Sequence, residues 1–252
     1  MKASKKRHIS SKLKKNRVLL KSRRLARHIP KTKRFSRHSL DKMLDRYKMV
    51  YLKPVNGLKG RGIMRAKKTG GKYQLRKGTS SSVFKDVRSL YQSVRKKIRK
   101  KPYLIQKGIR TLRYHGRSFD FRIMVQKNER RKWEVSGIVG RVAPPKRIVT
   151  NRSQGGKCKP AGLLLRPNMK HSQIKPYLKS LFRLSRRIGR QFEKAYPIVN
   201  KLGVDIAVRD DLKPWILEVN TRPAVTPFVK LGNKRMYRRI VHLLRWNKKR
   251  SS

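Results

Sequence analysis

The sequence Gly203-Val204-Asp205-Ile206, followed shortly by Trp215-Ile216-Leu217-Glu218-Val219-Asn220-Thr221-Arg222-Pro223, decides the interpretation of this chain. Residues 210–214 between the two apolar runs are turn formers, so the pattern predicts a β-hairpin. Strand alternation places Asp205 near the middle of the first strand, and Glu218 and Asn220 on one face of the second. Three oxygen-bearing side chains would then converge, which is the ligand chemistry of a hard cation such as Mg²⁺. The alternative is a surface hairpin with ordinary polar side chains.

The composition describes a globular and very basic protein. Of its 252 residues, 37% are hydrophobic, 73 are Lys or Arg and 11 are Asp or Glu, which gives a net charge of +62. A chain of this length can bury a sizeable core. No apolar run approaches the roughly 18 residues of a membrane span, and the basic N-terminus has no signal-peptide core. We therefore expect a soluble, cytoplasmic protein.

The charge indicates partners and not a reaction. A field of this sign attracts nucleic acid, an anionic membrane surface, or an acidic polymer or protein. Nonspecific binding to nucleic acid at low salt is expected from charge alone. The single cysteine, Cys158, excludes an internal disulfide and a cysteine-based zinc site.

The periodicity predicts an α+β fold in two halves that meet near residues 103–108. We expect a basic N-terminal segment over residues 1–37, an N-terminal subdomain over 38–108 and a C-terminal subdomain over 109–250. Residues 1–28 read as a marginal helix or solvated arm, and residues 143–168 as loop. Helices are predicted over 36–47, from Ser82 to before Pro102, over 174–196 and over 229–246. Strands outside the hairpin are predicted over 49–53, 63–65, 73–75, 103–106, 119–126 and 133–142.

A lysine at the end of one predicted strand precedes a glycine-rich loop. Lys53 is followed by Gly57, Gly60 and Gly62, and glycines let backbone N–H groups approach a polyphosphate closely. The loop is not a Walker A sequence, because no Gly-Lys-Ser/Thr follows. Taken by itself, a loop of this kind is by default the tip of a flexible hairpin.

Taken together, these motifs resemble the ATP-grasp superfamily, and within it the YheC/YheD group of endospore coat-associated proteins. The resemblance runs from about residue 30 to residue 246. It includes Lys53-Pro54 with Gly60-Arg61-Gly62, Tyr103-Leu104-Ile105-Gln106, Phe119-Asp120-Phe121-Arg122, Val149-Thr150-Asn151 with Gly155-Gly156, and the hairpin.

The resemblance implies an ATP-grasp fold in which two α+β subdomains hold ATP between them. The phosphates would lie under the glycine loop beside Lys53. The adenine would lie against residues 104–107, which include Ile105, Gln106 and Lys107.

The same resemblance assigns the remaining site residues. Asp205, Glu218 and Asn220 match the magnesium ligands of the family. Arg122 and Arg222 resemble the arginines that face the triphosphate or an acyl phosphate. Clustered carboxylates beside many cations, with a divalent metal neutralising the polyphosphate, agree with phosphoryl-transfer chemistry.

Two departures limit the transfer from the family. Many relatives carry an acid just after the adenine segment to hold the ribose, whereas this chain has Lys107, so ribose recognition is unassigned. Most members also precede this core with a substrate-binding domain, which 37 basic residues cannot form. The identities of the acid and the amine are therefore left open.

Two function classes remain. The first is an ATP- and Mg²⁺-dependent carboxylate–amine ligase acting through an acyl phosphate, with an acidic polymer or protein as acceptor and an expected association with the spore coat. Kinase chemistry is not separated from it. The second is a polycationic binding protein for nucleic acid or an anionic spore polymer, with a degenerate or regulatory ATP site.

Overall fold

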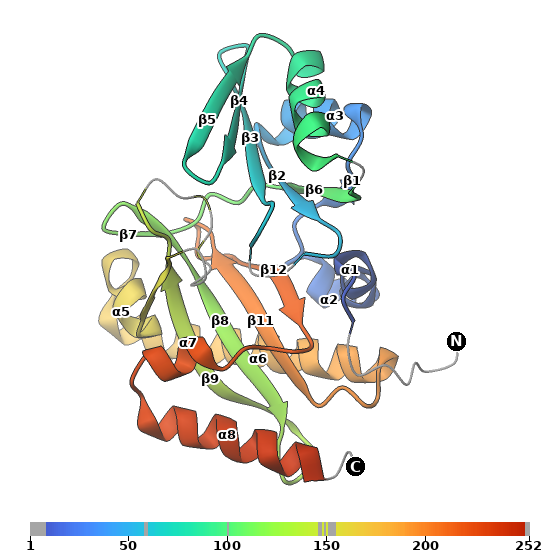
Figure 1. The fold of residues 1–252 in the computed structure, drawn as a ribbon. Helices are drawn as coiled ribbons and strands as arrows, with labels where there is room; N and C mark the ends of the chain where they lie inside the picture. The colour runs from blue at the N-terminus through green and yellow to red at the C-terminus, as the bar shows by residue number, and fades with distance from the viewer. Residues whose placement is uncertain are drawn as a thin grey trace. The chain divides into compact units, whose positions relative to one another are not determined.

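The computed structural model describes residues 9–57, 60–99, 101–145, 148, 150 and 155–249. The chain divides into two compact units, visible in Figure 1. Unit 1 contains residues 9–29, 111–142 and 157–249, and unit 2 contains residues 30–110 with the described residues between 143 and 156. The predicted boundary at 108 lies beside the change of unit after Arg110. The predicted basic segment over 1–37 is instead divided between the two units.

Unit 2 is one antiparallel sheet with two helices on one face. Its strand order is β1-β6-β2-β3-β4-β5. Its elements are β1 Thr32–Arg34, α3 Arg37–Tyr47, β2 Met49–Pro54, β3 Met64–Thr69, β4 Lys72–Lys77, β5 Ser80–Phe84, α4 Val87–Ile98 and β6 Tyr103–Lys107. Leu44 of α3 and Val94 of α4 pack on Leu52 and Ile105 of the sheet. The opposite face carries Tyr51, Lys53, Leu104 and Gln106,.

Unit 1 is a second antiparallel sheet, in the order β10-β9-β8-β11-β12, with β7 paired to β8. Its elements are α1 Lys12–Leu20, α2 Arg23–Ala26, β7 Arg113–Tyr114, β8 Arg117–Lys127, β9 Trp133–Val142, β10 Lys157–Lys159, α5 Ala161–Leu165, the 3₁₀ turn η2 Arg166–Asn168, α6 His171–Ala195, β11 Lys201–Val208, β12 Pro214–Asn220, α7 Thr226–Lys230 and α8 Lys234–Lys249. Helices α1, α2, α5 and α6 share a core with one face of the sheet. Helices α7 and α8 pack on part of the other face.

The N-terminal segment departs most from expectation. The interpretation of residues 1–28 as a marginal helix or solvated arm is wrong for the described part, which forms α1 and α2 and packs in unit 1. The Ser11 and Ser22 side chains cap the two helices,. Val18, Leu19 and Leu25 are buried in the core. These buried apolar side chains attach the helices to the core, while most of the cations of α1 and α2 lie outside it.

Two other segments also differ from prediction. A strand, β5, occupies Ser80–Phe84, where a helix was expected to begin at Ser82; α4 begins only at Val87. Asp86 is the true cap, because its side chain accepts a hydrogen bond from the Ser89 amide at 2.7 Å. The predicted loop over 143–168 contains β10, α5 and η2. In the described ranges of the chain, no helix is both long and apolar enough to cross a membrane.

Candidate functional site

The predicted hairpin is formed by β11 and β12, and its register brings the two predicted carboxylates side by side. Asp205 pairs directly with Glu218 on β12 and, on its other side, with Arg122 on β8. Directly paired residues project from the same face of an antiparallel sheet. The register shifts after Asp205, opposite residues 216–218, and a bulge of this kind re-aims the adjacent side chain. Arg122, Asp205 and Glu218 therefore form a row across three neighbouring strands.

Asp205 is held in a buried cluster of ion pairs. Arg122 donates to both of its oxygens, with 2.9 Å from Nη2 to Oδ2, and Arg141 Nη2 lies 3.1 Å from the same Oδ2. Arg141 also donates to Asp120, at 2.7 and 2.9 Å. Burial would raise the pKa of Asp205, but the charges of Arg122 and Arg141 keep it below its ordinary value,. Asp205 is therefore ionised, and both its oxygens have cationic partners.

Glu218, the next member of the row, faces two lysines of the N-terminal segment. Lys12 Nζ lies 3.8 Å and Lys15 Nζ 3.7 Å from Glu218 Oε1. Lys15 is only 5% exposed. Burial lowers the pKa of Lys15, while the Glu218 charge acts in the opposite direction. The ammonium groups thus lie beside a predicted metal ligand whose side chain is still 28% exposed.

Backbone contacts hold these lysines in place. The Ile9 amide donates to Thr221 Oγ1 at 3.1 Å, just beyond the end of β12. Gln191 of α6 donates to the Val18 carbonyl at 3.0 Å, and the Ile216 amide to the His28 carbonyl at 2.7 Å. The segment is therefore anchored to the strand that carries Glu218.

Asn220 lies two residues after Glu218, on the same face, opposite Gly203. A Cβ at Gly203 would lie 2.7 Å from Pro223 and 3.5 Å from Arg122, so only glycine fits there,. Arg222, predicted to face phosphate, is exposed beside this strand end.

The chemistry of this donor set suits magnesium. Two carboxylates and an amide oxygen are a small, all-oxygen set of the kind that leaves room for water and phosphate. Within the described residues, no three His, Cys, Asp or Glu side chains gather into a further metal cluster. Asp205 and Glu218 already face protein cations, so a divalent metal would replace some of these cations. Glu218 and Asn220 are the accessible donors.

The predicted phosphate-binding lysine belongs to unit 2. Lys53 on β2 donates to Gln106 Oε1 at 2.6 Å, and Gln106 Nε2 donates to Thr32 Oγ1 at 3.1 Å. Val50, Leu52 and Ile105 pack toward α3 and α4, so alternation places Lys53 and Gln106 on the opposite face. Two predicted nucleotide-binding residues are thus joined by a hydrogen bond.

The other residues of that prediction have different surroundings. Ile105 is 0% exposed, and its strand β6 is paired with β1 on one side and β2 on the other, so this residue is buried from a ligand. Lys107 Nζ lies 5.1 Å from the centre of the Tyr47 ring, at cation–π distance,. Its ammonium can still move, because the lysine stem is flexible.

The glycine loop has the conformations that its sequence requires. Gly60 and Gly62 have φ of 73° and 75°, which favours glycine. A Cβ at Gly62 would lie 2.7 Å from Tyr103 Oη, which donates to the Gly62 carbonyl at 3.0 Å. Gly57 is described, while residues 58 and 59 at the loop centre lie outside the described residues. So do residues 149 and 151, which belong to the quoted Val-Thr-Asn motif.

Two arginines that sequence reasoning missed lie on the same face as Lys53. Arg65 on β3 pairs with Tyr51 on β2 and with Arg76 on β4. The Nε atoms of both arginines are buried and, in the part of the chain that is described, have no hydrogen-bond partner. Like charges opposite one another destabilise a sheet, so a bound anion would relieve this arrangement. The alternation of cationic side chains along β3 and β4 could have indicated that Arg65 and Arg76 share a face. No local sequence pattern indicated that Arg141, Lys12 and Lys15 lie beside the predicted metal ligands.

Comparison with known proteins identifies the architecture. A family profile described as YheC/D-like ATP-grasp matches residues 3–245. The chain is 27% identical over 195 residues to the endospore coat-associated protein YheD of Bacillus subtilis (strain 168), covering 75% of this chain and 42% of YheD. It is 25% identical over 201 residues to YheC of the same organism, covering 78% and 55%. The chain therefore spans about half the length of these curated relatives.

Solved structures share the fold at low sequence identity. D-cycloserine synthetase DcsG gives a TM-score of 0.56 at 10% identity, covering 92% of this chain and 69% of that protein. The ATP-grasp ligase PsnB, complexed with a phosphomimetic variant of its minimal precursor, Mg and ADP, gives 0.52 at 12% identity, covering 93% and 59%. These likenesses show that the chain has the ATP-grasp fold predicted from its motifs.

Proposed function

The chain belongs to the YheC/D-like ATP-grasp family, and we propose that it is an ATP- and Mg²⁺-dependent ligase that joins a carboxylate to an amine. The row of Arg122, Asp205 and Glu218, with Asn220 on the same face, carries the proposal. Lys53 and the two facing arginines of unit 2 support it, because they offer cations to a polyphosphate. The PsnB structure contains Mg and ADP, which agrees with this use of the fold.

The proposed reaction has two steps. An oxygen of the acceptor carboxylate attacks the γ-phosphorus of ATP, the bond to the bridging oxygen breaks, and ADP leaves as the acyl phosphate forms. The amine then attacks the acyl carbon, phosphate leaves with the bonding electrons, and the amine releases a proton. Positioning and charge neutralisation are sufficient for both steps, so no side-chain nucleophile is required.

Each residue has a defined role in this proposal. Glu218 and Asn220 would hold the magnesium. Asp205 would become a third ligand if the metal replaced Arg122 or Arg141 at one of its oxygens. The metal would neutralise charge on the phosphates. Asp205 orients Arg122 toward the transferred phosphoryl group, and the exposed Arg222 would reach the acyl phosphate. Lys53 and the glycine loop would bind the nucleotide phosphates, and Gln106 and Lys107 would contact the adenine, with Ile105 buried beside them.

An acidic polymer or protein is the proposed acceptor, and association with the spore coat is proposed by similarity to YheD and YheC. The alternative function is a polycationic binding protein in which the ATP site no longer turns over. One observation favours it: protein cations already compensate both Asp205 and Glu218.

Glu218→Gln tests the proposal, with Asp210→Asn in the exposed turn of the same hairpin as the matched control. ADP formation from Mg·ATP is measured with polyglutamate and acidic proteins as acceptors, and products are examined for a mass shift. The first variant should lower turnover by orders of magnitude and the control should not. Equal turnover in wild type and Glu218→Gln would remove the metal assignment.

Ligand-dependent stability tests the nucleotide site without requiring an acceptor. A non-hydrolysable Mg·ATP analogue at about 100 times Kd should add about 2.7 kcal/mol to the free energy of unfolding. Tripolyphosphate serves as the charge control. Identical stabilisation by the two ligands, together with no turnover, would favour the polycationic binding protein.

A further inference from the structure

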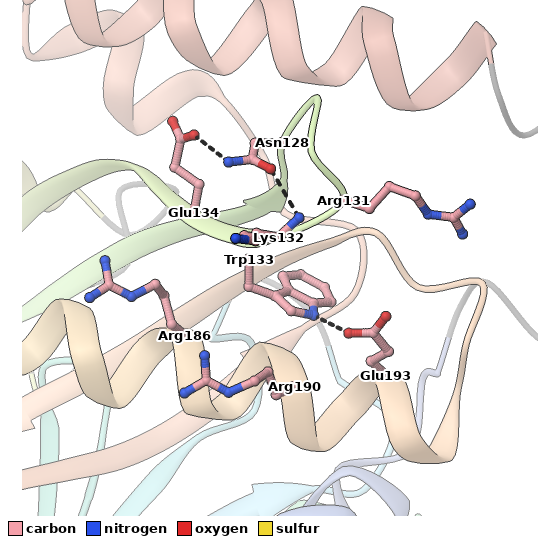
Figure 2. Close-up of a pocket in the computed structure, with 8 residues that line it drawn as sticks. All are labelled: Asn128, Arg131, Lys132, Trp133, Glu134, Arg186, Arg190 and Glu193. Atoms are coloured by element: carbon pink, nitrogen blue, oxygen red, sulfur yellow. Dashed lines mark hydrogen bonds between the residues drawn. The ribbon is translucent and has the colours of Figure 1, made fainter.

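Unit 1 contains a second cationic site, formed by the turn between β8 and β9 and by the facing side of α6. It is a pocket of about 550 Å³, shown in Figure 2. It begins at Asn128, the residue after the end of β8 and six residues along the chain from Arg122, or roughly 20 Å at strand spacing. It also lies toward α6, whereas Arg122 projects from the opposite face of the sheet. The pocket is therefore separate from the candidate ligase residues of this unit.

The charges around the pocket are unbalanced. Its two acids, Glu134 and Glu193, are held by cations that do not line it. Arg239 donates to Glu134 at 2.7 and 2.8 Å, and Lys127 Nζ lies 2.6 Å from Glu193. The second oxygen of Glu193 accepts from Trp133 Nε1 at 2.6 Å. Each carboxylate thus already has a direct cationic partner outside the lining, and of the lining cations Arg131 acts on Glu193 through its charge.

Four lining cations consequently have no direct ion pair among the residues that are described: Arg131, Lys132, Arg186 and Arg190. Arg186 and Arg190 are one helical turn apart, and Figure 2 shows both projecting from the same side of α6. Side chains at this spacing are neighbours on a helix surface. Two guanidinium forks side by side are well suited to binding oxyanions.

The turn that carries the other two cations is internally braced. Asn128 Oδ1 accepts from the backbone amides of Arg130 at 3.2 Å and Lys132 at 2.9 Å. The backbone N–H of Asn128 donates to the backbone carbonyl of Lys132 at 2.9 Å. A turn that is already ordered loses little conformational freedom when a ligand binds.

The aromatic ring in the pocket argues against nucleobase recognition. Trp133 is 5% exposed. It packs so closely on Gly189 that a Cβ there would lie 2.4 Å from the ring, and Lys127 Nζ is 6.0 Å from its centre. Single-stranded nucleic acids gain much of their affinity by stacking bases on open aromatic faces. This site offers cations without a stacking surface.

We propose that this pocket is a docking site for an acidic polypeptide segment. The Asp and Glu carboxylates of the segment pair with Arg186 and Arg190, and the side chains of Arg131 and Lys132 contact the same segment from the turn. Charge complementarity selects this occupant, and the covered indole disfavours nucleic acid. The proposal does not depend on the nucleotide site, because it uses no residue of that site.

Two double variants of the same helix test the proposal. Arg186→Gln/Arg190→Gln removes two cations of the lining, and Arg183→Gln/Arg187→Gln removes two exposed cations of α6 that do not line the pocket. Binding of a fluorescent decaglutamate peptide and of an RNA of equal length is measured by anisotropy at about 0.15 M salt, where diffuse attraction is largely screened. Circular dichroism and thermal melts verify the fold of each variant.

Wild type should bind the peptide more tightly than the RNA. The lining variant should lose about tenfold or more in peptide affinity, and the control about twofold or less. Equal losses in the two variants would show diffuse charge attraction and no site. Tighter RNA binding with the same dependence on the lining would make nucleic acid the occupant and overturn the proposal, as would the absence of peptide binding by wild type. Turnover of Mg·ATP, assayed separately, reports on the proposed function alone.

Discussion

Lys15 is a buried cation beside a carboxylate that we assign to metal binding. Its Nζ is 3.7 Å from Glu218, and α1 holds it there. Two unit charges about 4 Å apart interact by about 4 kcal/mol at an effective dielectric constant of 20. A divalent cation arriving at Glu218 would therefore meet repulsion and a competitor for the same oxygen.

We predict that Lys15→Met binds Mn²⁺, used as a spectroscopic substitute for Mg²⁺, about tenfold more tightly than wild type. Free Mn²⁺ is measured by electron paramagnetic resonance without nucleotide, so that the result is independent of activity. Lys14→Met, an exposed position of the same helix, should change the affinity little. Unchanged or weaker affinity in Lys15→Met would show that this lysine does not compete with the metal.

At this scale the sequence predicted the hairpin residues better than their partners. Asp205 and Glu218 were placed correctly on paired strands because alternation and the turn are local signals. Arg141 and Lys15 reach them from elements distant in the chain, so their approach depends on tertiary packing that no local pattern encodes. The roles of these residues toward a ligand remain predictions.

Helix α6 and the sheet of unit 1 meet at Gly189, where the Trp133 indole lies against the helix backbone. We predict that Gly189→Ala lowers the free energy of unfolding by about 1–3 kcal/mol, because the new methyl group would overlap the ring,. Urea denaturation measures the loss. In Gly162→Ala, the comparison variant in α5, the new Cβ would lie at an ordinary 3.6 Å from Ile174. It should be neutral or gain up to about 1 kcal/mol; equal effects at both positions would contradict the packing argument.

Helix α8 is tied to the β8–β9 turn by ion pairs. Arg239 donates to Glu129 at 2.5 and 2.9 Å, and this lowers the pKa of Glu129 from 4.5 to about 2. A carboxyl whose pKa is lower in the folded state contributes stability above its unfolded pKa and loses it as pH falls through the folded value. The pair should therefore weaken between about pH 4.5 and about pH 2.

Arg239→Gln removes this contribution together with that of Glu134, to which Arg239 also donates and whose pKa it also lowers. The stability difference between wild type and variant, taken from urea midpoints across that pH window, should shrink as the pH falls. A difference that stays constant with pH would mean that neither Glu129 nor Glu134 is linked to stability through Arg239. Lys234→Gln at the start of α8 provides the charge-matched control and should show no such trend.

Secondary structure was predicted correctly where one hydrophobic period dominates the sequence. Helices α3 and α6 were recognised from their apolar stripes, and they begin within a few residues of the predicted starts. Strand β5 was missed because Val83 fits the helical stripe of the following residues, although it is 63% exposed on a strand. Pairing with β4 overrides that local pattern.

For the whole molecule, a net charge of +62 causes electrostatic repulsion that lowers the free energy of unfolding. We predict that the unfolding midpoint in urea rises as ionic strength increases from about 0.02 to about 0.3 M, because screening shortens the range of repulsion. Sodium chloride and choline chloride should act alike if the effect is screening. A midpoint that falls with both salts would mean that local ion pairs outweigh the net charge.

The arrangement of unit 1 along the chain has a consequence for its synthesis. Residues 9–29 leave the ribosome early, but the strand that anchors Ile9 and His28 follows roughly 190 residues later, a delay of about 10 to 40 seconds at 5–20 residues per second. Unit 2 can begin to form during that interval, while α1 has neither α6 nor β12 to pack against. Lys12 and Lys15 can therefore meet Glu218 only after β12 has been synthesised, so a nascent chain stalled before β12 should contain a folded unit 2 but no assembled cluster of Lys12, Lys15 and Glu218.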